Sequence, residues 1–268
     1  MAGTVLVTGT SSGIGEAVTQ SFLADGWNVV ATARDPAKAA GGRSDPRLLA
    51  ARLDVIDPDS IATAFDAAEQ QFGAVDVVVN NAGIGLGGPL EGMTLDQFRD
   101  HLEVNVVGVA AVCQAAAARM RPHRSGLIIN VTSLTGRVGV PFLAPYCASK
   151  FAVEGMTEAL YYELRPLGIR VKLVEPGGAR TSFNHPWADH PAYSPASESV
   201  REKMEQGVEG AAPPSDVAKV ILAAAKDRTH RLRYAATSAV PALRMHRLLS
   251  ESAWRKMLSG SFGLDSQR

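Results

Sequence analysis

Tyr146 and Lys150 are the two residues of this chain whose types and spacing point most directly to chemistry. They stand four residues apart in a stretch with a helical pattern, so their side chains share one helix face. A tyrosine with its ordinary pKa of about 10 is a poor base near neutrality, and a neighbouring ammonium lowers that pKa. The pair indicates general acid–base catalysis on an oxygen, because the alkoxide left by hydride transfer to a carbonyl needs a proton.

The spacing alone is a weak signal, and the placement of two further polar residues strengthens it. Ser133 follows the apolar run Gly126–Val131, and ligands of parallel sheets bind at the carboxyl ends of such strands. Asn105 lies inside an otherwise apolar helical stretch, where its low helix propensity needs a reason. We expect Asn105 either to bridge two helices through a hydrogen bond or to belong to the same site as Ser133.

A glycine-rich turn joins the first apolar run to the first helical stretch. Gly9 permits a tight turn, Gly13 lets the backbone approach a pyrophosphate, and Gly15 allows close packing of helix on strand. The free N–H groups and the positive end of the helix would then face the phosphates. Because spaced glycines also serve plain turns, it is their place between strand and helix that favours a dinucleotide cofactor.

The end of the second apolar run bears on which dinucleotide is bound. An NAD site usually has an acidic residue there, whereas this chain has Ala33 followed by Arg34. A guanidinium can bond a 2′-phosphate and stack on adenine, so Arg34 favours NADP(H). Two alternatives remain open: Arg34 as a solvated loop residue, and Asp35 facing the ribose, which would favour NAD.

The elements that must position these residues follow an alternating order. Short apolar runs, mostly β-branched and without polar alternation, predict strands buried on both faces of a parallel sheet. Helical patterns separate them, with start signals at Asp57-Pro58 and Ser215-Asp216. We therefore expect one domain over 1–268, an α/β doubly wound, seven-stranded parallel sheet with helices on both faces. The predicted strands are Thr4–Val7, Asn28–Ala31, Leu48–Leu53, Val75–Val79, Gly126–Val131, Ile169–Val174 and Arg231–Ala235. The predicted helices are Gly13–Asp25, Pro58–Phe72, Leu95–Met120, Pro145–Leu164 and Ser215–Lys226.

Two segments break the alternation. Gly177–Ala212 is rich in Pro, Gly, Ser and His and is long for a connection, which predicts a lid or substrate-binding loop. Ala239–Ser259, within a C-terminal extension over 239–268, predicts a basic helical tail. Such a tail can rest on a membrane surface, but composition favours a helix packed over the mouth of the site or against another subunit.

Composition excludes several classes of function. The 268 residues carry 27 basic and 27 acidic side chains, so no global field attracts nucleic acid or an anionic membrane. Cys113 and Cys147 lie apart in apolar contexts, which predicts reduced thiols and no metal site. No run of 18 uncharged apolar residues predicts a membrane span, and the first strand begins too early for a signal peptide. We expect a cytoplasmic protein.

Taken together, the motifs resemble those of the short-chain dehydrogenases/reductases. The resemblance covers residues 4 to about 181 and includes Gly-x-x-x-Gly-x-Gly, Asn80-Asn81-Ala82-Gly83, Tyr-x-x-x-Lys and Pro176-Gly177 with Thr181. It implies a Rossmann fold and an NADP(H)-dependent oxidoreductase that interconverts an alcohol and a ketone.

The resemblance also implies roles for single residues. Tyr146 would be the general acid/base, Ser133 would polarise the carbonyl, Lys150 would tune Tyr146 and hold the ribose, and Asn105 would anchor a water. Asn80 would support the sheet. The implied cofactor-binding residues are Gly9, Ser11, Ser12, Gly13, Ile14, Gly15, Arg34, Asp54, Val55, Asn81, Gly83, Tyr146, Lys150, Pro176, Gly177 and Thr181. Asp54-Val55 is equally explained as a strand end with a helix cap.

Substrate and partners are less constrained. A largely apolar pocket would be lined by the segments Leu134–Leu143, Gly83–Leu90 and Gly177–Ala212, which favours a hydrophobic small molecule. Three histidines are predicted to be surface residues without a role in metal binding. These are His185, His190 and His230. Members of the family commonly form homodimers or homotetramers through the two long helices. Two alternative functions are a nucleotide-sugar epimerase and a non-catalytic NADP sensor. This chain lacks the glycine pattern that is usual in such epimerases.

Overall fold

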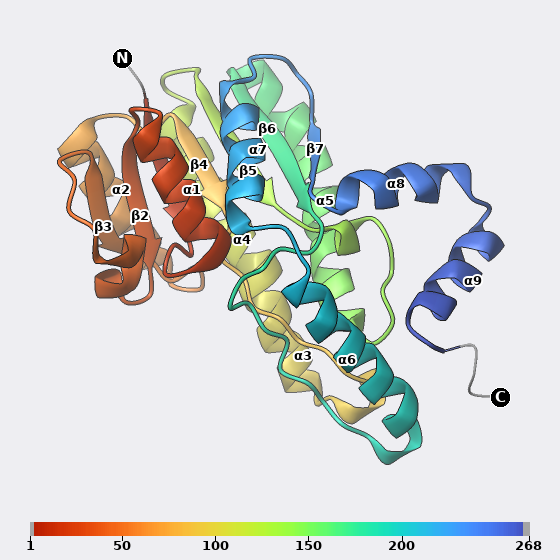
Figure 1. Cartoon of the computed structure of the whole chain (residues 1–268). Coiled ribbons are helices and arrows are strands. Elements are labelled where there is room, and N and C mark those ends of the chain that lie inside the picture. Colours follow the sequence, from red (N-terminus) through yellow and green to blue (C-terminus); the bar gives the residue numbers. More distant parts are fainter. Residues whose placement is uncertain (1–2, 265–268) are drawn as a thin grey trace.

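The structure is a computed structural model that describes residues 3–264, and it contains one seven-stranded parallel sheet. The strand order is β3-β2-β1-β4-β5-β6-β7, so the chain winds outward from β1 in one direction and then from β4 in the other (Figure 1). This confirms the predicted doubly wound α/β fold. The strands are β1 (Thr4–Thr8), β2 (Asn28–Ala33), β3 (Leu48–Arg52), β4 (Val77–Asn80), β5 (Gly126–Val131), β6 (Ile169–Pro176) and β7 (Arg233–Ala236).

The burial of the strands follows their place in the sheet. Every residue of β1, β4 and β5 is buried, as expected for central strands covered on both faces. By contrast, β3 has no fully buried residue, because it lies at an edge of the sheet. This explains why Leu48–Leu53 carried the weakest apolar signal among the predicted strands.

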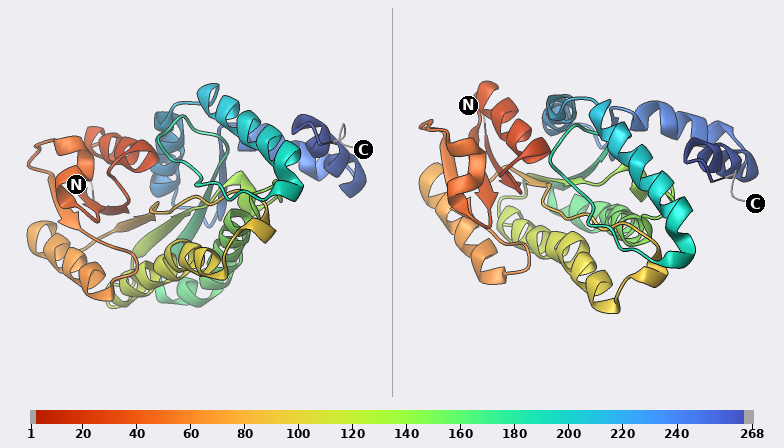
Figure 2. Two further views of the ribbon diagram at one scale, coloured as in Figure 1. Left: turned by 90° about the horizontal axis from the view of Figure 1, so that it is seen from below. Right: turned by 60° about the horizontal axis from the view of Figure 1, so that its bottom comes forward.

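Helices form a layer on each face of the sheet (Figure 2). On one face, α1 (Gly13–Ala24) and α7 (Pro214–Lys226) pack Phe22 and Ile221 into the core. On the other face lie α2 (Pro58–Phe72), α4 (Gly108–Met120) and α5 (Ala144–Leu164), with Phe65, Val112 and Val153 buried. The cap predicted at Asp57 is present, since its side chain accepts from the Ser60 backbone N–H. Short helical turns are η1 (Pro36–Gly42), η2 (Leu90–Gly92), η4 (Leu134–Gly136), η5 (Arg165–Leu167) and η6 (Pro191–Tyr193).

The predicted helix Leu95–Met120 is continuous but not uniform. It consists of α3 (Leu95–Leu102), the π-helical turn η3 (Glu103–Val107) and α4. Within residues 3–264 it is the one helix long and apolar enough to cross a membrane by length and composition, a test that core helices also pass. Its residues Val112 and Ala116 lie in the core against the sheet.

Two segments differ from the regular βα order. The predicted loop Gly177–Ala212 contains α6 (Ser194–Glu209), so the expectation of an irregular connection is wrong over that range. The sequence hid α6 because it buries only Ser197 and Val200, too few for an apolar stripe.

The predicted helical tail consists of α8 (Ala239–Leu248) and α9 (Glu251–Ser261), which lie beyond β7 (Figure 1). The end of α9 meets α6, where Ser199 Oγ donates to Phe262 O at 3.0 Å and Lys203 Nζ to Ser261 O at 2.9 Å. The tail therefore packs on the connection that follows β6. Residues 265–268 of the predicted extension lie outside the described residues.

Candidate active site

Ser133, Tyr146 and Lys150 come together at the carboxyl edge of the sheet. Ser133 follows β5 and caps η4, accepting from the Thr135 backbone N–H at 3.1 Å. Tyr146 and Lys150 lie in the first two turns of α5, and Ser133 is near enough to Tyr146 to act on the pKa of its phenol. Lys150 Nζ lies 5.6 Å from the centre of the Tyr146 ring and donates to Val131 O at 3.2 Å. The three predicted catalytic side chains thus share one site.

Burial sets the protonation of this group. It raises the pKa of the Tyr146 phenol well above its usual value, although the Ser133 hydrogen bond acts in the opposite direction. Burial also lowers the pKa of Lys150 to about 8, against the opposing effect of Glu154. Desolvation of the phenolate sets the direction of the Tyr146 shift, and the predicted lowering of that pKa by Lys150 stays a prediction. At neutral pH the phenol is a proton donor.

Asn105 is held at the site by the backbone of the loop after β4. Its Oδ1 accepts from the Ile84 N–H at 2.9 Å and its Nδ2 donates to Ile84 O at 2.8 Å. The π-helical turn η3 surrounds Asn105, and such turns are frequent at functional sites. Asn105 thus ties η3 to this loop, and its Nδ2 also donates a long hydrogen bond of 3.5 Å to Ser149 Oγ on α5, so the predicted bridge between two helices is present as well. No sequence pattern announced the π turn.

The glycine-rich turn has the shape of an anion cradle. Gly9 and Gly13 have positive φ of 71° and 60°, and a Cβ on Gly15 would overlap Gly9 O. Ser12 precedes α1 without a side-chain cap, so the first N–H groups of α1 are not satisfied by its hydroxyl. Ser11 and Ser12 are exposed beside Ile14. This arrangement fits the phosphates of a dinucleotide, because a helix start with free N–H groups favours anions.

Several predicted residues support the cradle from neighbouring strands. Asn81 Nδ2 donates to Thr8 O and Gly9 O, both at 3.0 Å, and so holds the turn in place. Asn80 Nδ2 donates to Asn130 Oδ1 at 2.8 Å across β4 and β5, as expected of a residue that supports the sheet. A Cβ on Gly83 would meet Asn105 Oδ1 at 3.0 Å, which ties Gly83 to the catalytic group.

At the far end of β2, Arg34 and Asp35 are both exposed. The Asp35 carboxylate caps η1 by accepting from the Ala37 N–H at 3.1 Å, and it lies 3.8 Å from Lys38 Nζ. Its polar contacts are therefore directed toward η1. After β3, Asp54 Oδ1 accepts from the Ile56 N–H of its own turn at 3.3 Å, and Val55 is buried against Gly108.

The segment after β6 returns to the glycine-rich turn. Pro176 ends β6, and the Gly177 N–H donates to Ala236 O at 3.0 Å. Thr181 lies over Gly13, where a Cβ would meet its side chain at 3.1 Å. A surface cleft of about 420 Å³ opens here, lined by Gly13, Glu16, Ala17, Gln20, Arg180, Thr181, Ser182, Pro214 and Ser215. Arg180 places a cation at this cleft that the sequence analysis did not single out.

Two histidines that the sequence analysis missed border the catalytic tyrosine. His185 lies 4.8 Å from Tyr146 between ring centres, and Phe183 lies at 6.0 Å. The prediction that His185 is a surface residue is therefore wrong. It belongs to the site, because the segment after β6 folds back across α5. On the other side, the buried ring of His101 lies 6.1 Å from Tyr146. Only three-dimensional proximity identifies either residue.

The segment 183–190, which we call the lid, packs against glycines of the loop after β4. Side chains on Gly85, Gly87, Gly88 or Gly92 would overlap or crowd lid residues between Asn184 and His190. The Gly87 N–H donates to Pro186 O and the Ala188 N–H donates to Gly87 O, each at 2.9 Å. Trp187 packs over Gly87 and donates from Nε1 to Ser197 Oγ at 2.8 Å. The glycines therefore set how closely the lid approaches Tyr146.

Replacing Gly87 with Ala is expected to displace the lid, because the new Cβ would overlap the Trp187 ring. We expect the KM for the substrate to rise roughly tenfold or more, since small displacements at a site have large kinetic costs. Trp187 fluorescence, measured in a Trp27→Phe, Trp254→Phe background, should shift at the same time. Gly155→Ala is the matched control, because a Cβ at Gly155 on α5 has no neighbour within 4 Å. An unchanged KM and an unchanged Trp187 fluorescence in Gly87→Ala would refute the close packing of the lid on Gly87.

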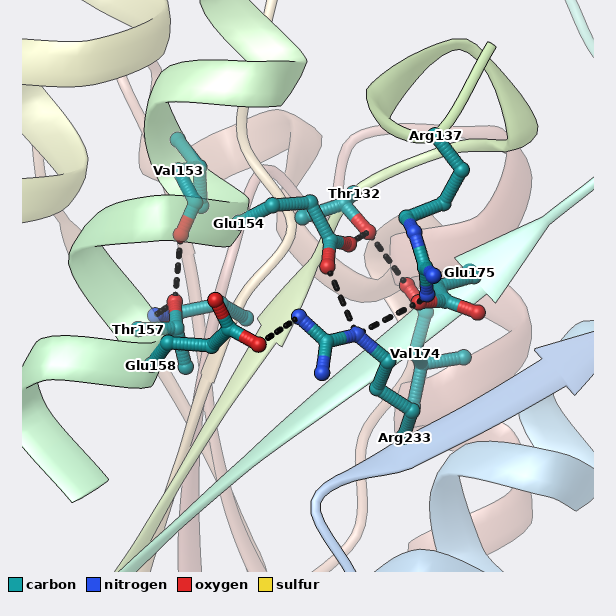
Figure 3. Close-up of polar contacts among 10 residues, drawn as sticks. Thr132, Arg137, Val153, Glu154, Thr157, Glu158, Val174, Glu175 and Arg233 are labelled. Carbon is teal, nitrogen blue, oxygen red and sulfur yellow. Dashed lines mark hydrogen bonds and ion pairs between the residues drawn. The ribbon is translucent and has the colours of Figure 1, made fainter.

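A partly buried network of charges joins α5, β6 and β7 (Figure 3). Arg233 Nε lies 3.1 Å from Glu154 Oε2 and 3.2 Å from Glu175 Oε1, while its Nη2 lies 2.8 Å from Glu158 Oε1. Arg137 Nη1 also bonds Glu175 Oε1, at 2.9 Å. Both Glu154 and Glu175 are buried, and burial raises the pKa of Glu154.

The network joins the segments that carry the site. Thr132, next to Ser133, donates to Glu154 Oε1 at 2.6 Å, and Glu154 lies one turn after Lys150 on α5. Glu175 directly precedes Pro176 and Gly177 at the end of β6. Through the carboxylates of Glu154 and Glu175, Arg233 on β7 therefore links the end of β5, helix α5 and the turn after β6.

Comparison with known proteins agrees with this geometry. A family model described as short chain dehydrogenase matches residues 3–192. The uncharacterized oxidoreductase YusZ of Bacillus subtilis is 36% identical, over 94% of this chain and 96% of its own length. Retinol dehydrogenase 8 of Bos taurus is 37% identical, over 82% of this chain and 76% of its own length.

Solved structures show the same architecture. A short-chain dehydrogenase from Streptomyces avermitilis has a TM-score of 0.82 and 32% identity, with 99% of this chain and 98% of that chain covered. A short chain dehydrogenase/reductase from Burkholderia phymatum in complex with NAD has a TM-score of 0.80, 25% identity and coverage of 96% and 95%. ElxO with NADP bound has a TM-score of 0.71, 25% identity and coverage of 88% and 98%.

The family match spans most of the chain, full-length relatives carry oxidoreductase names, and structural neighbours hold nicotinamide dinucleotides. This chain belongs to the short-chain dehydrogenase/reductase family, whose members are oxidoreductases acting on CH–OH groups.

Proposed function

We propose that the protein is an NADP(H)-dependent carbonyl reductase that interconverts a hydrophobic ketone and its secondary alcohol. The observation that carries this proposal is that Ser133, Tyr146 and Lys150 lie together at the same sheet edge as the glycine-rich turn, with Lys150 Nζ 5.6 Å from the centre of the Tyr146 ring. A proton donor, a second hydroxyl and a dinucleotide cradle are the parts that carbonyl reduction needs.

Each residue has a stated part in the reaction. The bound cofactor supplies the hydride. Ser133 and Tyr146 hold the carbonyl oxygen of the substrate, and the Tyr146 hydroxyl donates its proton to that oxygen as negative charge develops on it. Lys150 stabilises the resulting phenolate as an ammonium. Because burial raises the pKa of Tyr146, the phenol is protonated near neutrality and is ready to donate its proton during reduction.

The preference for NADP(H) rests on Arg34. The place that holds an acidic residue in NAD sites is Ala33, whose methyl group neither bonds a ribose hydroxyl nor repels a phosphate. Asp35, the competing carboxylate, is engaged with Ala37 and Lys38 of η1. Exposed Arg34 is then the side chain suited to a 2′-phosphate.

An apolar substrate is supported by the side chains near Tyr146. Val138 and Leu143 are buried beside the catalytic helix, and Phe183 contacts the Tyr146 ring. Retinol dehydrogenase 8 is named for an apolar alcohol, and we extend that chemical class to this chain. We further propose that copies associate through α4 and α5, where Val107, which directly precedes α4, and Phe151 on α5 are exposed. Cys113 and Cys147 are both free thiols, which suits the reducing cytoplasm.

The test is a titration of NADPH and of NADH into the wild type and Arg34→Ala, followed by cofactor fluorescence. We expect wild-type protein to bind NADPH more tightly, and Arg34→Ala to weaken NADPH about 10- to 100-fold, the value of one or two charge-assisted hydrogen bonds. NADH affinity should change little. Arg43→Ala, an exposed arginine after η1, is the matched control. Tighter binding of NADH by the wild type would assign the ribose to Asp35, and binding of neither dinucleotide would refute the function.

A further inference from the structure

His101 on α3 has a hydrogen-bonding arrangement that fixes its tautomer. The Ile84 backbone fixes the orientation of the Asn105 amide, because the Ile84 N–H donates to Oδ1 and the Ile84 carbonyl accepts from Nδ2. For its second hydrogen, Nδ2 has two neighbours, His101 Nε2 at 3.0 Å and Ser149 Oγ at 3.5 Å, and the histidine nitrogen is the nearer acceptor. Since Asn105 donates in that contact, His101 Nε2 accepts, and in a neutral ring the proton is then on Nδ1.

The ring is neutral because of where it lies. His101 is 1% exposed, and burial together with the charge of Lys150 lowers its pKa to about 4. A protonated ring would also lose its contact with Asn105, because Nε2 would no longer accept. His101 therefore presents one N–H donor, at Nδ1, throughout the neutral range.

That donor is unsatisfied in the described part of the chain. Nδ1 of His101 is buried and has no hydrogen-bond partner among residues 3–264. A buried donor without an acceptor costs about 1–3 kcal/mol, so natural proteins keep one chiefly where a ligand or water completes it. The ring lies against the Tyr146 ring, and its pKa responds to Lys150 and His185. The unsatisfied N–H thus belongs to the catalytic centre and not to a remote core.

His185 is a less suitable donor at the same centre. Its Nδ1 is also buried without a partner, but that atom is packed against Gly85, where a Cβ would lie 2.7 Å away. His185 also belongs to the lid, whereas His101 is carried by α3 and braced by Asn105. The inference therefore rests on His101.

We propose that His101 donates a hydrogen bond from Nδ1 to a second oxygen of the bound substrate, close to the carbonyl that Ser133 and Tyr146 hold. The preferred substrates are then ketones with a neighbouring oxygen, such as β-keto esters or hydroxyketones, rather than plain alkyl ketones. This inference rests on the proposed function and narrows its substrate class. A fixed donor beside an otherwise apolar pocket discriminates strongly, because a substrate without the oxygen leaves the N–H unpaired.

The test compares two substrates of equal chain length, ethyl acetoacetate and heptan-2-one, in the wild type and three variants. His101→Leu removes the donor and the acceptor. His101→Asn places an amide N–H near the position of Nδ1, and His123→Leu is a control at an exposed histidine. We expect His101→Leu to lower kcat/KM for the keto ester about tenfold, and for the plain ketone less than about threefold. His101→Asn should retain most of the preference, and His123→Leu should change neither value.

Two kinetic results would overturn the proposal. An equal loss for both substrates in His101→Leu would mean that the ring acts only by bracing Asn105. No loss for either would mean that the ring is a packing residue.

Binding gives a second readout that does not depend on turnover. The affinities of the two compounds, measured by titration calorimetry, should differ in the wild type and converge in His101→Leu. If the wild type reduces neither ketone, the proposed function fails, while this affinity ratio still decides the role of His101: convergence supports it, and an unchanged ratio refutes it.

Discussion

Replacing Tyr146 with Phe is expected to lower kcat for ketone reduction by about 10³-fold, because it removes the proton donor while leaving the aromatic ring in place. The affinity for NADPH should stay within about twofold, since the glycine-rich turn and Arg34, which would hold the phosphates, are unchanged and Tyr146 would lose only its hydroxyl. Steady-state kinetics and cofactor fluorescence measure the two quantities. Tyr162→Phe is the matched control, because Tyr162 lies on the same helix and is 74% exposed.

The pH dependence of the two directions tests the same assignment. The pKa of Tyr146 is raised by burial, so the phenol stays protonated and reduction should be insensitive to pH across the neutral range. Oxidation of the alcohol needs the phenolate, whose fraction rises about tenfold per pH unit below the pKa. The oxidation rate should therefore climb with pH through the alkaline range. A flat oxidation profile, or full activity in Tyr146→Phe, would remove Tyr146 from the mechanism. Binding of NADPH by the wild type without any turnover would instead favour an NADP sensor.

Replacing Arg233 with Met is expected to lower the free energy of unfolding by about 3–5 kcal/mol, because it leaves Glu154 and Glu175 buried without their shared partner. Urea denaturation measures this loss. Arg228→Met is the control, since Arg228 is an exposed arginine of the same region. Adding Glu154→Gln to Arg233→Met should restore part of the loss, because one of the unpaired charges is then removed.

The loss should depend on pH in a defined direction. Glu154 has a folded pKa above its unfolded value, so the folded state binds more protons and its stability falls as pH rises between those two values. Without Arg233 this effect should grow. The Arg233→Met variant should therefore be closer to the wild type in mildly acidic buffer than at neutral pH. A loss below about 1 kcal/mol would show that the network has no large part in stability.

Much of the catalytic centre was predictable because its signals are local. The spacing of Tyr146 and Lys150 on one helix, and of Gly9, Gly13 and Gly15 between strand and helix, depends on backbone periodicity alone. Ser133 could be placed because strands of a parallel sheet end at a common edge. The order of the buried runs was enough to predict the doubly wound sheet, since right-handed crossovers leave few alternatives.

Other features had no local signal. The polar helix α6 was predicted as a loop because its stabilising contacts come from α9, far along the chain. The π turn around Asn105 lies between the polar helix α3 and the apolar helix α4, and nothing in their sequences marks a change in the helical hydrogen-bond pattern. His185 was taken for a surface residue because nothing in the order of residues shows that the lid returns to Tyr146.

By itself, then, the sequence determined the sheet, the cofactor turn and the acid–base helix of this protein, since each depends on interactions between near neighbours in the chain. Only the tertiary structure decided the protonation of Tyr146, the pairing of Arg233 with Glu154 and Glu175, and the unpaired N–H of His101. The physical reason is that burial and charge pairing depend on which distant segments meet. Desolvation then changes a pKa or leaves a donor unsatisfied in a way that residue spacing does not encode.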